Sequence, residues 1–382
     1  MRDGCIAFHY ICRKSTIFVE TSAATDKIGN LMKKHTITIL IIELLSVCLF
    51  VFYPSPIESV AWKPSRIPAL QGVLERNSIL RDTEVFAVGA LDAPEDVVIG
   101  QNGTIYTGLE NGDIVTVALD GTVTPWVNTG GRPLGMKFNN DNDLIVCDGY
   151  RGLLSISKTG EISVLTDHVE GNPINFANGL DIAEDGKIYF TEASSKWERG
   201  DYLHDLLETK PYGRLLMYDP AAGTTSVLME GLYFANGIAL SSDERYLLVT
   251  ETWRYRVMRY WLKGDKAGSS GQFIGNLPGF PAGISNQNNH FWLSLITLRN
   301  PVLDKTHETT WLKDALAKLP EFLTPAPIPY GLVLKVKETG PIESSFHDVG
   351  GEVITGISSA VEKDGYLYFG TFKGDRVGRY KL

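Results

Sequence analysis

The stretch INFANGLDIAEDGKIYFTE at residues 174–192 decides the fold of this chain. The Asn-Gly pair at residues 178–179 opens a short apolar strand. The Asp-Gly pair at residues 185–186 is typical of a tight hairpin turn, because both positions tolerate positive φ. The β-branched and aromatic residues 188–190 then form a second strand. The stretch therefore predicts a small antiparallel hairpin.

Five more copies of this hairpin unit can be found along the chain. They lie at residues 94–106, 133–146, 234–252, 282–293 and 355–369. A third strand with its own turn follows most copies. Six repeats of small antiparallel meanders predict an all-β fold, a six-bladed β-propeller. A β-sandwich is the alternative, but a sandwich has no reason to repeat its loop chemistry.

A lone strand at residues 83–88 precedes the first repeat, and the last repeat ends at Leu382 after only three strands. We expect the lone strand to supply the missing outer strand of the last blade. Such pairing would close the ring and remove the exposed edges of an open sheet. The predicted propeller domain spans residues 81–382, and the proline-containing residues 54–80 are expected to be a linker.

The chain has 382 residues, of which 43% are hydrophobic, and a formal net charge of -9. This size suits one large all-β domain with an appendage. An acidic surface argues against nucleic acid as a partner.

One apolar segment, residues 36–53, would span about 27 Å as a helix and predicts a transmembrane anchor. Lys33 and Lys34 precede it, which places residues 1–35 in the cytoplasm and the propeller on the extracytoplasmic side, periplasmic, extracellular or lumenal. A cleavable signal is the competing interpretation, because residues 59–61 resemble a cleavage site. That site lies far beyond the apolar run, which favours the anchor.

Residues 1–31 look neither targeting nor structural. Met32 followed by two lysines and an apolar run is typical of a membrane-targeted N-terminus. We therefore expect that translation starts at Met32 and that residues 1–31 are not translated.

Two insertions, residues 193–212 and 299–330, interrupt the repeats. The second has apolar residues spaced for one face of a helix, which Pro320 limits. Such a helix could pack on a blade, close the channel mouth as a lid or contact a membrane.

Glu95, Asn178 and Asn236 each stand just before the innermost strand of a repeat. Loops between strands meet around the propeller axis, so these side chains are expected to converge. One carboxylate and two amide oxygens suit Ca²⁺. Alternatively, each Asn forms only a local turn before its Gly. The local sequence reveals no nucleophile, and His347-Asp348 is the one adjacent pair of catalytic residue types.

Residues 58–382 resemble the strictosidine synthase-like family, in particular its adipocyte plasma membrane-associated protein-like branch. The matching pieces keep their order and spacing through all six repeats. They are residues 188–192, 195–199, 201–202, 213–216, 236–237, 277–281 and 364–370. The resemblance implies a six-bladed propeller related to gluconolactonases and paraoxonases, a single N-terminal anchor, and hydrolysis of aryl esters or lactones.

The resemblance also implies an axial divalent ion, usually calcium, with Glu95, Asn178 and Asn236 at three of its ligand positions. Family members commonly have Pro-Asp-Asn-Ile where this chain reads Pro-Ala-Gly-Ile at residues 281–284. A carboxylate and an amide are therefore missing, and we expect a weak or incomplete site.

Two further departures concern the implied catalysis. Leu134 stands where paraoxonases have a His, and Ser358 stands nearest to the catalytic Glu of strictosidine synthase, so alkaloid condensation is not expected.

The leading hypothesis is a membrane-tethered hydrolase of small esters or lactones, in which an axial divalent ion polarises the substrate carbonyl. The rival hypothesis is a binding or scaffold propeller that has lost a full metal site. The two missing ligands favour the rival, and the retained Glu95 favours the enzyme.

Overall fold

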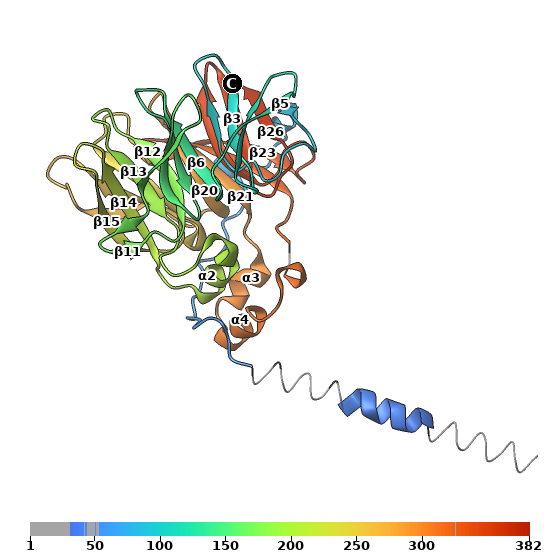
Figure 1. Ribbon diagram of the computed structural model, residues 1–382. Coiled ribbons are helices and arrows are strands. Elements are labelled where there is room, and N and C mark those ends of the chain that lie inside the picture. The colour runs from blue at the N-terminus through green and yellow to red at the C-terminus, as the bar shows by residue number, and fades with distance from the viewer. Residues whose placement is uncertain (1–30, 42, 44–49, 51–52, 325) are drawn as a thin grey trace, which may run out of the picture. The chain divides into compact units, whose positions relative to one another are not determined.

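The computed structural model describes residues 31–41, 43, 50, 53–324 and 326–382 (Figure 1). The chain divides into two compact units, residues 1–55 and Pro56–Leu382. The second unit holds all of the β-sheet structure among the described residues.

Six four-stranded antiparallel sheets make up the second unit, and each has the strand order of a meander. Five of them use consecutive strands. These are β2 (Val97–Ile99), β3 (Ile105–Gly108), β4 (Asp113–Val117) and β5 (Val123–Asn128); β6 (Pro133–Phe138), β7 (Leu144–Asp148), β8 (Gly152–Ile156) and β9 (Ile162–Thr166); β12 (Ala177–Ile182), β13 (Ile188–Glu192), β14 (Gly213–Asp219) and β15 (Thr224–Leu232); β16 (Ala235–Leu240), β17 (Tyr246–Glu251), β18 (Arg256–Trp261) and β19 (Ser270–Ile274); β20 (Gly279–Gln287), β21 (His290–Leu298), β22 (Tyr330–Lys337) and β23 (Ile342–Val349).

The sixth sheet closes the ring. Its order is β1 (Glu84–Phe86), β26 (Val377–Lys381), β25 (Tyr366–Thr371) and β24 (Ile357–Lys363). Val85 pairs with Gly378, and the buried Phe86 pairs with Val377. The predicted supply of the outer strand by the lone N-terminal strand is therefore confirmed. A separate small hairpin, β10 (His168–Val169) with β11 (Asn172–Pro173), lies outside the blades.

The innermost strand of each sheet contacts the innermost strands of its two neighbours, in the cyclic order β2, β6, β12, β16, β20 and β24. These six strands therefore surround a common axis. Apolar side chains fill the space between neighbouring blades, as where Ile145 and Leu153 of one blade meet Leu180 and Phe190 of the next. The six-bladed β-propeller predicted from the repeats is confirmed.

The hairpin at residues 183–187 differs from the predicted two-residue turn. Ala183 and Lys187 form the closing hydrogen bond, so three residues make the loop. Gly186 has a φ of 85°, whereas Asp185 does not have a positive φ and its carboxylate accepts from the Lys187 backbone N–H. A three-residue loop that ends in a left-handed Gly is a common alternative for such hairpins.

Two insertions carry the α-helices that the structure describes in this unit, and the short 3-10 helix η4 (Thr252–Arg254) follows β17. The insertion between β13 and β14 contains η3 (Arg199–Asp201) and α2 (Tyr202–Glu208). The insertion between β21 and β22 contains α3 (Pro301–Thr306), α4 (Thr310–Leu316) and η5 (Glu321–Leu323). Helices α2, α3 and α4 lie together in Figure 1, and the His204 ring meets the Ala317 carbonyl at 3.2 Å. We call this pair of insertions the cap.

Residues 56–82 lie along the cap and the last two blades, and we call them the strap. They include η1 (Gly72–Leu74) and η2 (Ile79–Asp82). The Val60 N–H donates to Glu208 and the Trp62 N–H donates to His307, both in the cap. Further along, the Val73 carbonyl accepts from Ser345 of β23. The expected linker residues 56–80 thus belong to the compact unit of the propeller.

The predicted membrane anchor is not supported. Among the residues that the structure describes, no helix is long and apolar enough to cross a membrane. This contradicts the predicted single-pass topology with a cytoplasmic N-terminus and an extracytoplasmic propeller. Residues 1–30, where a late translation start was predicted, and 42, 44–49 and 51–52 of the predicted anchor lie outside the described residues.

Candidate functional site

Six residues at equivalent positions form a ring where the innermost strands begin. These are Glu95, Leu134, Asn178, Asn236, Ala282 and Ser358, and we call them the axial ring. Neighbouring strands touch here through glycines: a Cβ on Gly135 or Gly179 would lie only 2.6 Å from the carbonyl oxygen of Asn178 or Asn236. Only glycine permits this approach of two backbones.

Hydroxyl groups from neighbouring strands fix the backbone of the ring. Thr191 donates to the Asn236 carbonyl at 2.5 Å and Thr250 donates to the Ala282 carbonyl at 2.7 Å. Ser358 donates to the Glu95 carbonyl at 2.5 Å, which joins the sixth blade to the first. The ring is thus a rigid backbone frame with six side-chain positions around the axis.

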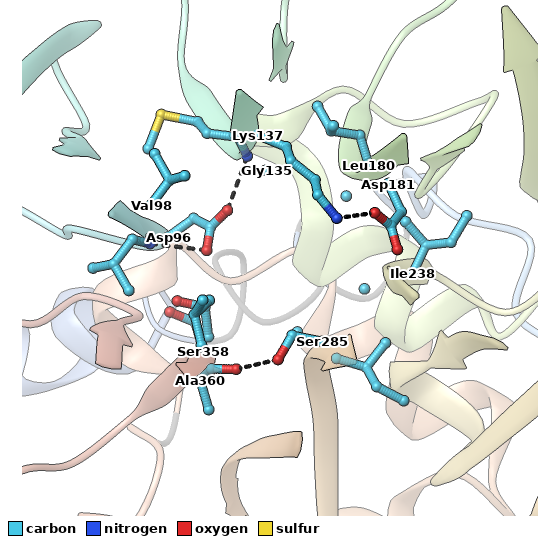
Figure 2. Close-up of a pocket in the computed structure, with 18 of the residues that line it drawn as sticks. Asp96, Val98, Gly135, Lys137, Leu180, Asp181, Ile238, Ser285, Ser358 and Ala360 are labelled. Carbon is cyan, nitrogen blue, oxygen red and sulfur yellow. Dashed lines mark hydrogen bonds and ion pairs between the residues drawn. The ribbon is translucent and has the colours of Figure 1, made fainter. Parts of the chain in front are cut away.

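A cavity of about 240 Å³ lies along the axis beside this ring. All ring residues except Ala282 line it, together with residues further along the innermost strands (Figure 2). Glu95, Asn178 and Asn236, predicted to converge, are brought together at this cavity.

The Asn178 and Asn236 side chains are buried, at 6% and 7% exposure, and both line the cavity. The hydrogen bonds among the described residues include none to either side-chain amide. A local turn would use these amides on nearby backbone groups, which is not what the structure shows. The two amides are therefore open to a ligand in the cavity.

Glu95 is held by a buried cation. Its Oε2 lies 3.0 Å from Nη2 of Arg132, a side chain with no exposed surface. The same guanidinium donates to the Ala93 and Gly108 carbonyls, and its Nε lies 3.0 Å from Glu110 Oε2. Arg132 thus fixes the position of Glu95 and offsets its negative charge.

This donor set fits a tightly held divalent ion poorly. Ca²⁺ takes about six to eight oxygen ligands, and its affinity follows ligand charge. The ring offers one carboxylate that already has a cation, and Ala282 supplies no donor atom in its side chain. Among the described residues, no group of three or more His, Cys, Asp or Glu could hold a metal.

Four charged residues that the sequence reasoning did not single out line the cavity: Asp96, Lys137, Asp181 and Glu362. Lys137 of β6 forms an ion pair with Asp181 of the neighbouring strand β12 (Figure 2). Asp96 accepts from the backbone N–H groups of Val97 and Met136, and burial raises its pKa to about 6.

A bulge in β6 and another in β12 explain why Lys137 and Asp181 were missed. The pairing register shifts between Pro133 and Met136 and between Ala177 and Leu180. Lys137 and Asp181 stand three positions after ring residues and still face the cavity, whereas alternation by two would point them away. A Gly follows four of the six ring residues, Leu134, Asn178, Asn236 and Ala282, and this repeated Gly is the available signal for such a bulge.

The cap stands at the same end of the propeller as the axial ring, because both insertions join the second and third strands of a blade. Tyr202 of α2 donates to Glu321 of η5, which also pairs with Lys373 of the last blade. The helical insertion, for which packing on a blade, a lid and a membrane contact were the three alternatives, thus bridges to the other insertion and to the last blade.

The His347-Asp348 pair lies away from the cavity. The His347 ring is buried between the Tyr330 hydroxyl at 2.8 Å and the Ser345 hydroxyl at 2.9 Å. Asp348 accepts from two backbone N–H groups and lies 3.5 Å from Arg81. These contacts are structural.

Solved structures with the same fold include enzymes and a binding protein. A gluconolactonase from Xanthomonas campestris superimposes with a TM-score of 0.58 and 16% identity, covering 87% of this chain and 99% of that one. A calcium-binding regucalcin from Agrobacterium tumefaciens gives 0.55 and 12%, covering 78% and 92%. At these identities the likeness shows the fold alone.

Sequence comparison gives a closer relationship. Family profiles described as strictosidine synthase and strictosidine synthase-like, N-terminal, match residues 178–265 and 72–117. Adipocyte plasma membrane-associated protein of Rattus norvegicus is 36% identical, covering 86% of this chain and 93% of the relative. Protein STRICTOSIDINE SYNTHASE-LIKE 4 of Arabidopsis thaliana is 32% identical, covering 86% and 88%. This chain therefore belongs to the strictosidine synthase-like family.

Proposed function

We propose that the protein hydrolyses small esters or lactones in the axial cavity. The observation that carries this proposal is the pair of buried, unpartnered amides of Asn178 and Asn236 beside the fixed carboxylate of Glu95. The fold shared with a gluconolactonase supports a lactone as one substrate class. The cavity volume suits a small molecule.

Each of the three residues would have its own role in hydrolysis. The amide N–H groups of Asn178 and Asn236 would donate to the substrate carbonyl oxygen, where negative charge develops as water attacks. Glu95 would accept a proton from that water through Oε1, since Oε2 is bound to Arg132. The proton would then pass to the leaving oxygen, so that an acid and an alcohol, or one hydroxy acid, are formed.

A weak calcium site at Glu95, Asn178 and Asn236 stays a prediction. When bound, Ca²⁺ would polarise the substrate carbonyl. Metal content and calorimetric titration of the purified protein test this prediction independently of hydrolysis.

A non-catalytic binding propeller is the second candidate. It is favoured by Ala282 and Leu134, which place two apolar side chains in the axial ring. In this case the open amides would hold a ligand without reaction.

A panel of aryl esters and lactones, followed by acid release in a pH-stat, tests the proposal. We expect Glu95→Gln and Asn178→Ala each to lower kcat/KM by about 100-fold or more. The exposed Asn172→Ala serves as control and should retain full activity. Binding without turnover, lost in Asn178→Ala, would favour the second candidate. Turnover unchanged in both ring variants would exclude this site.

A further inference from the structure

Four carboxyl groups line the axial cavity, and each already has its charge compensated or its oxygens occupied. They are Glu95, Asp96, Asp181 and Glu362. Glu362 accepts from the Trp292 indole at 2.7 Å and the Asn288 amide at 2.9 Å. Asp96 accepts from the backbone N–H groups of Val97 and Met136, one on each carboxylate oxygen.

The two remaining carboxylates, Glu95 and Asp181, each bind a side-chain cation. At the inner part of the cavity Lys137 reaches Asp181, which also accepts from the backbone N–H groups of Ile182 and Leu240 (Figure 2). At the axial ring Arg132 binds Glu95. The acids of the cavity are thus compensated from within the chain.

Arg132 is placed to act on any cation near Glu95. Its guanidinium is fully buried and fixed by two backbone carbonyls and two carboxylates, so it cannot swing away. Arg132 and Arg199 together face Glu95 and Glu110, two positive charges against two negative ones. A divalent ion at Glu95 would meet no net attraction from this cluster and would lie near a fixed positive charge.

We propose that Arg132 is an internal cation that takes the place of a metal ion at the axial ring and excludes divalent ions from Glu95. The inference goes beyond the proposed hydrolysis, because it concerns what occupies the charged end of the cavity and not what reacts there. It makes Arg132 a determinant of ion specificity. The neutral variant Arg132→Met leaves the Glu95 carboxylate beside two open amides, which is a better cation site.

Calcium titration of the full-length protein by calorimetry tests this inference, with Arg132→Met and Arg132→Gln as variants. We expect no binding by the parent in the submillimolar range and a gain in affinity of about tenfold or more in either variant. Arg199→Met is the matched control, because Arg199 pairs with Glu110 and not with Glu95. It should raise calcium affinity much less than either Arg132 variant, because Arg132 still binds Glu95.

Two outcomes would overturn the inference. The first is stoichiometric calcium in the purified parent, or a shift of its melting temperature by calcium or a chelator. This measurement on the parent protein tests the inference even if both Arg132 variants fail to fold. The second is folded Arg132 variants that bind calcium no better than Arg199→Met. A parent protein that binds calcium and is active would contradict this inference but not the proposed function. A parent protein that is free of calcium and shows no hydrolysis would contradict the proposed function but not this inference.

Discussion

His307 is fully buried in the cap, where neither ring nitrogen has a hydrogen-bond partner. Its ring packs on Trp62 with centroids 5.3 Å apart. Burial lowers its pKa from 6.5 to about 3, and the nearby Lys313 and Arg254 cations add to the effect. The folded state therefore holds this histidine neutral at pH values where the unfolded chain binds a proton.

This difference predicts a loss of stability in acid. Below pH 6.5 the unfolded chain takes up a proton that the folded chain excludes until about pH 3, so stability falls as the pH falls through this window. We expect His307→Leu to reduce the loss between pH 6.5 and 5 by about 2 kcal/mol. Urea unfolding of parent and variant at both pH values measures it. The exposed His168→Asn should show the parent's pH dependence, and an identical slope in His307→Leu would refute the assignment.

Ala282 is the ring position where a carboxylate would do most for cation binding. It is buried, at 1% exposure, and only Ser358 separates it from Glu95 around the ring. We expect Ala282→Asp to bind Ca²⁺ about tenfold more tightly than the parent, because the new charge has no internal partner. Calcium should then raise the melting temperature of the variant.

The adjacent Gly283 has to stay unchanged in that experiment, since a Cβ there would collide with the Ser358 carbonyl. Calorimetric titration of parent and Ala282→Asp decides the matter. If neither protein binds any divalent ion, Glu95, Asn178 and Asn236 are not part of a metal site.

At this scale the sequence located Glu95, Asn178 and Asn236, because residues that begin equivalent strands must meet at the axis. It did not reveal Arg132, which stands in the loop between β5 and β6. Pairing of Arg132 with Glu95 depends on how two blades approach each other, which no local pattern encodes. Lys137 and Asp181 were missed because the bulges in β6 and β12 change which side chains face the cavity.

At the scale of elements, the three-residue strand β1 joins the two ends of the ring. Phe86 is buried beside Val97 and Ile105 of the first blade, and Glu84 pairs with Arg379 of β26. Deleting residues 82–88 should lower the free energy of unfolding by about 3 kcal/mol or more, since an aromatic side chain and an edge pairing are lost.

Thermal unfolding of the deletion variant measures this effect. Val88→Ala, which alters a side chain that is 54% exposed, is the control and should melt with the parent. An unchanged melting temperature after the deletion would mean that the ring closes by other contacts.

The strand pattern was predictable because each repeat carries its own turn and apolar strands, and these are local signals. The contacts of the cap were not predictable. The second insertion has apolar side chains spaced as for one helix, but the structure has α3, α4 and η5 there. In the structure, Ile57 of the strap packs on Leu207 of α2 and on Ala317, so the strap and α2 cover part of the apolar face of the second insertion. The spacing of the apolar residues alone does not reveal this contact.

At the scale of the whole molecule, the boundary of the propeller unit differs from the boundary that composition suggests. Prolines mark residues 54–80 as a linker, but the compact unit begins at Pro56. Lys313 of α4 is fully buried and donates to the Val60 carbonyl at 2.6 Å, and Arg299 donates to the Ser65 carbonyl at 2.7 Å. Two buried cations thus depend on the strap for acceptors.

Because of this dependence, we expect two truncated proteins, residues 56–382 and residues 81–382, to differ in stability. The shorter one loses the buried Ile57 and the Trp62 ring that packs on His307, and it leaves the Lys313 ammonium short of an acceptor. We expect it to melt roughly 5–10 °C below the longer one. Residues 299–330 should also become sensitive to proteolysis, because the strap no longer holds α4. Calorimetry and timed digestion of both proteins test this, with the full chain as reference for the longer one. Equal melting temperatures and equal digestion would show that residues 56–80 contribute nothing to the fold and serve only as a linker.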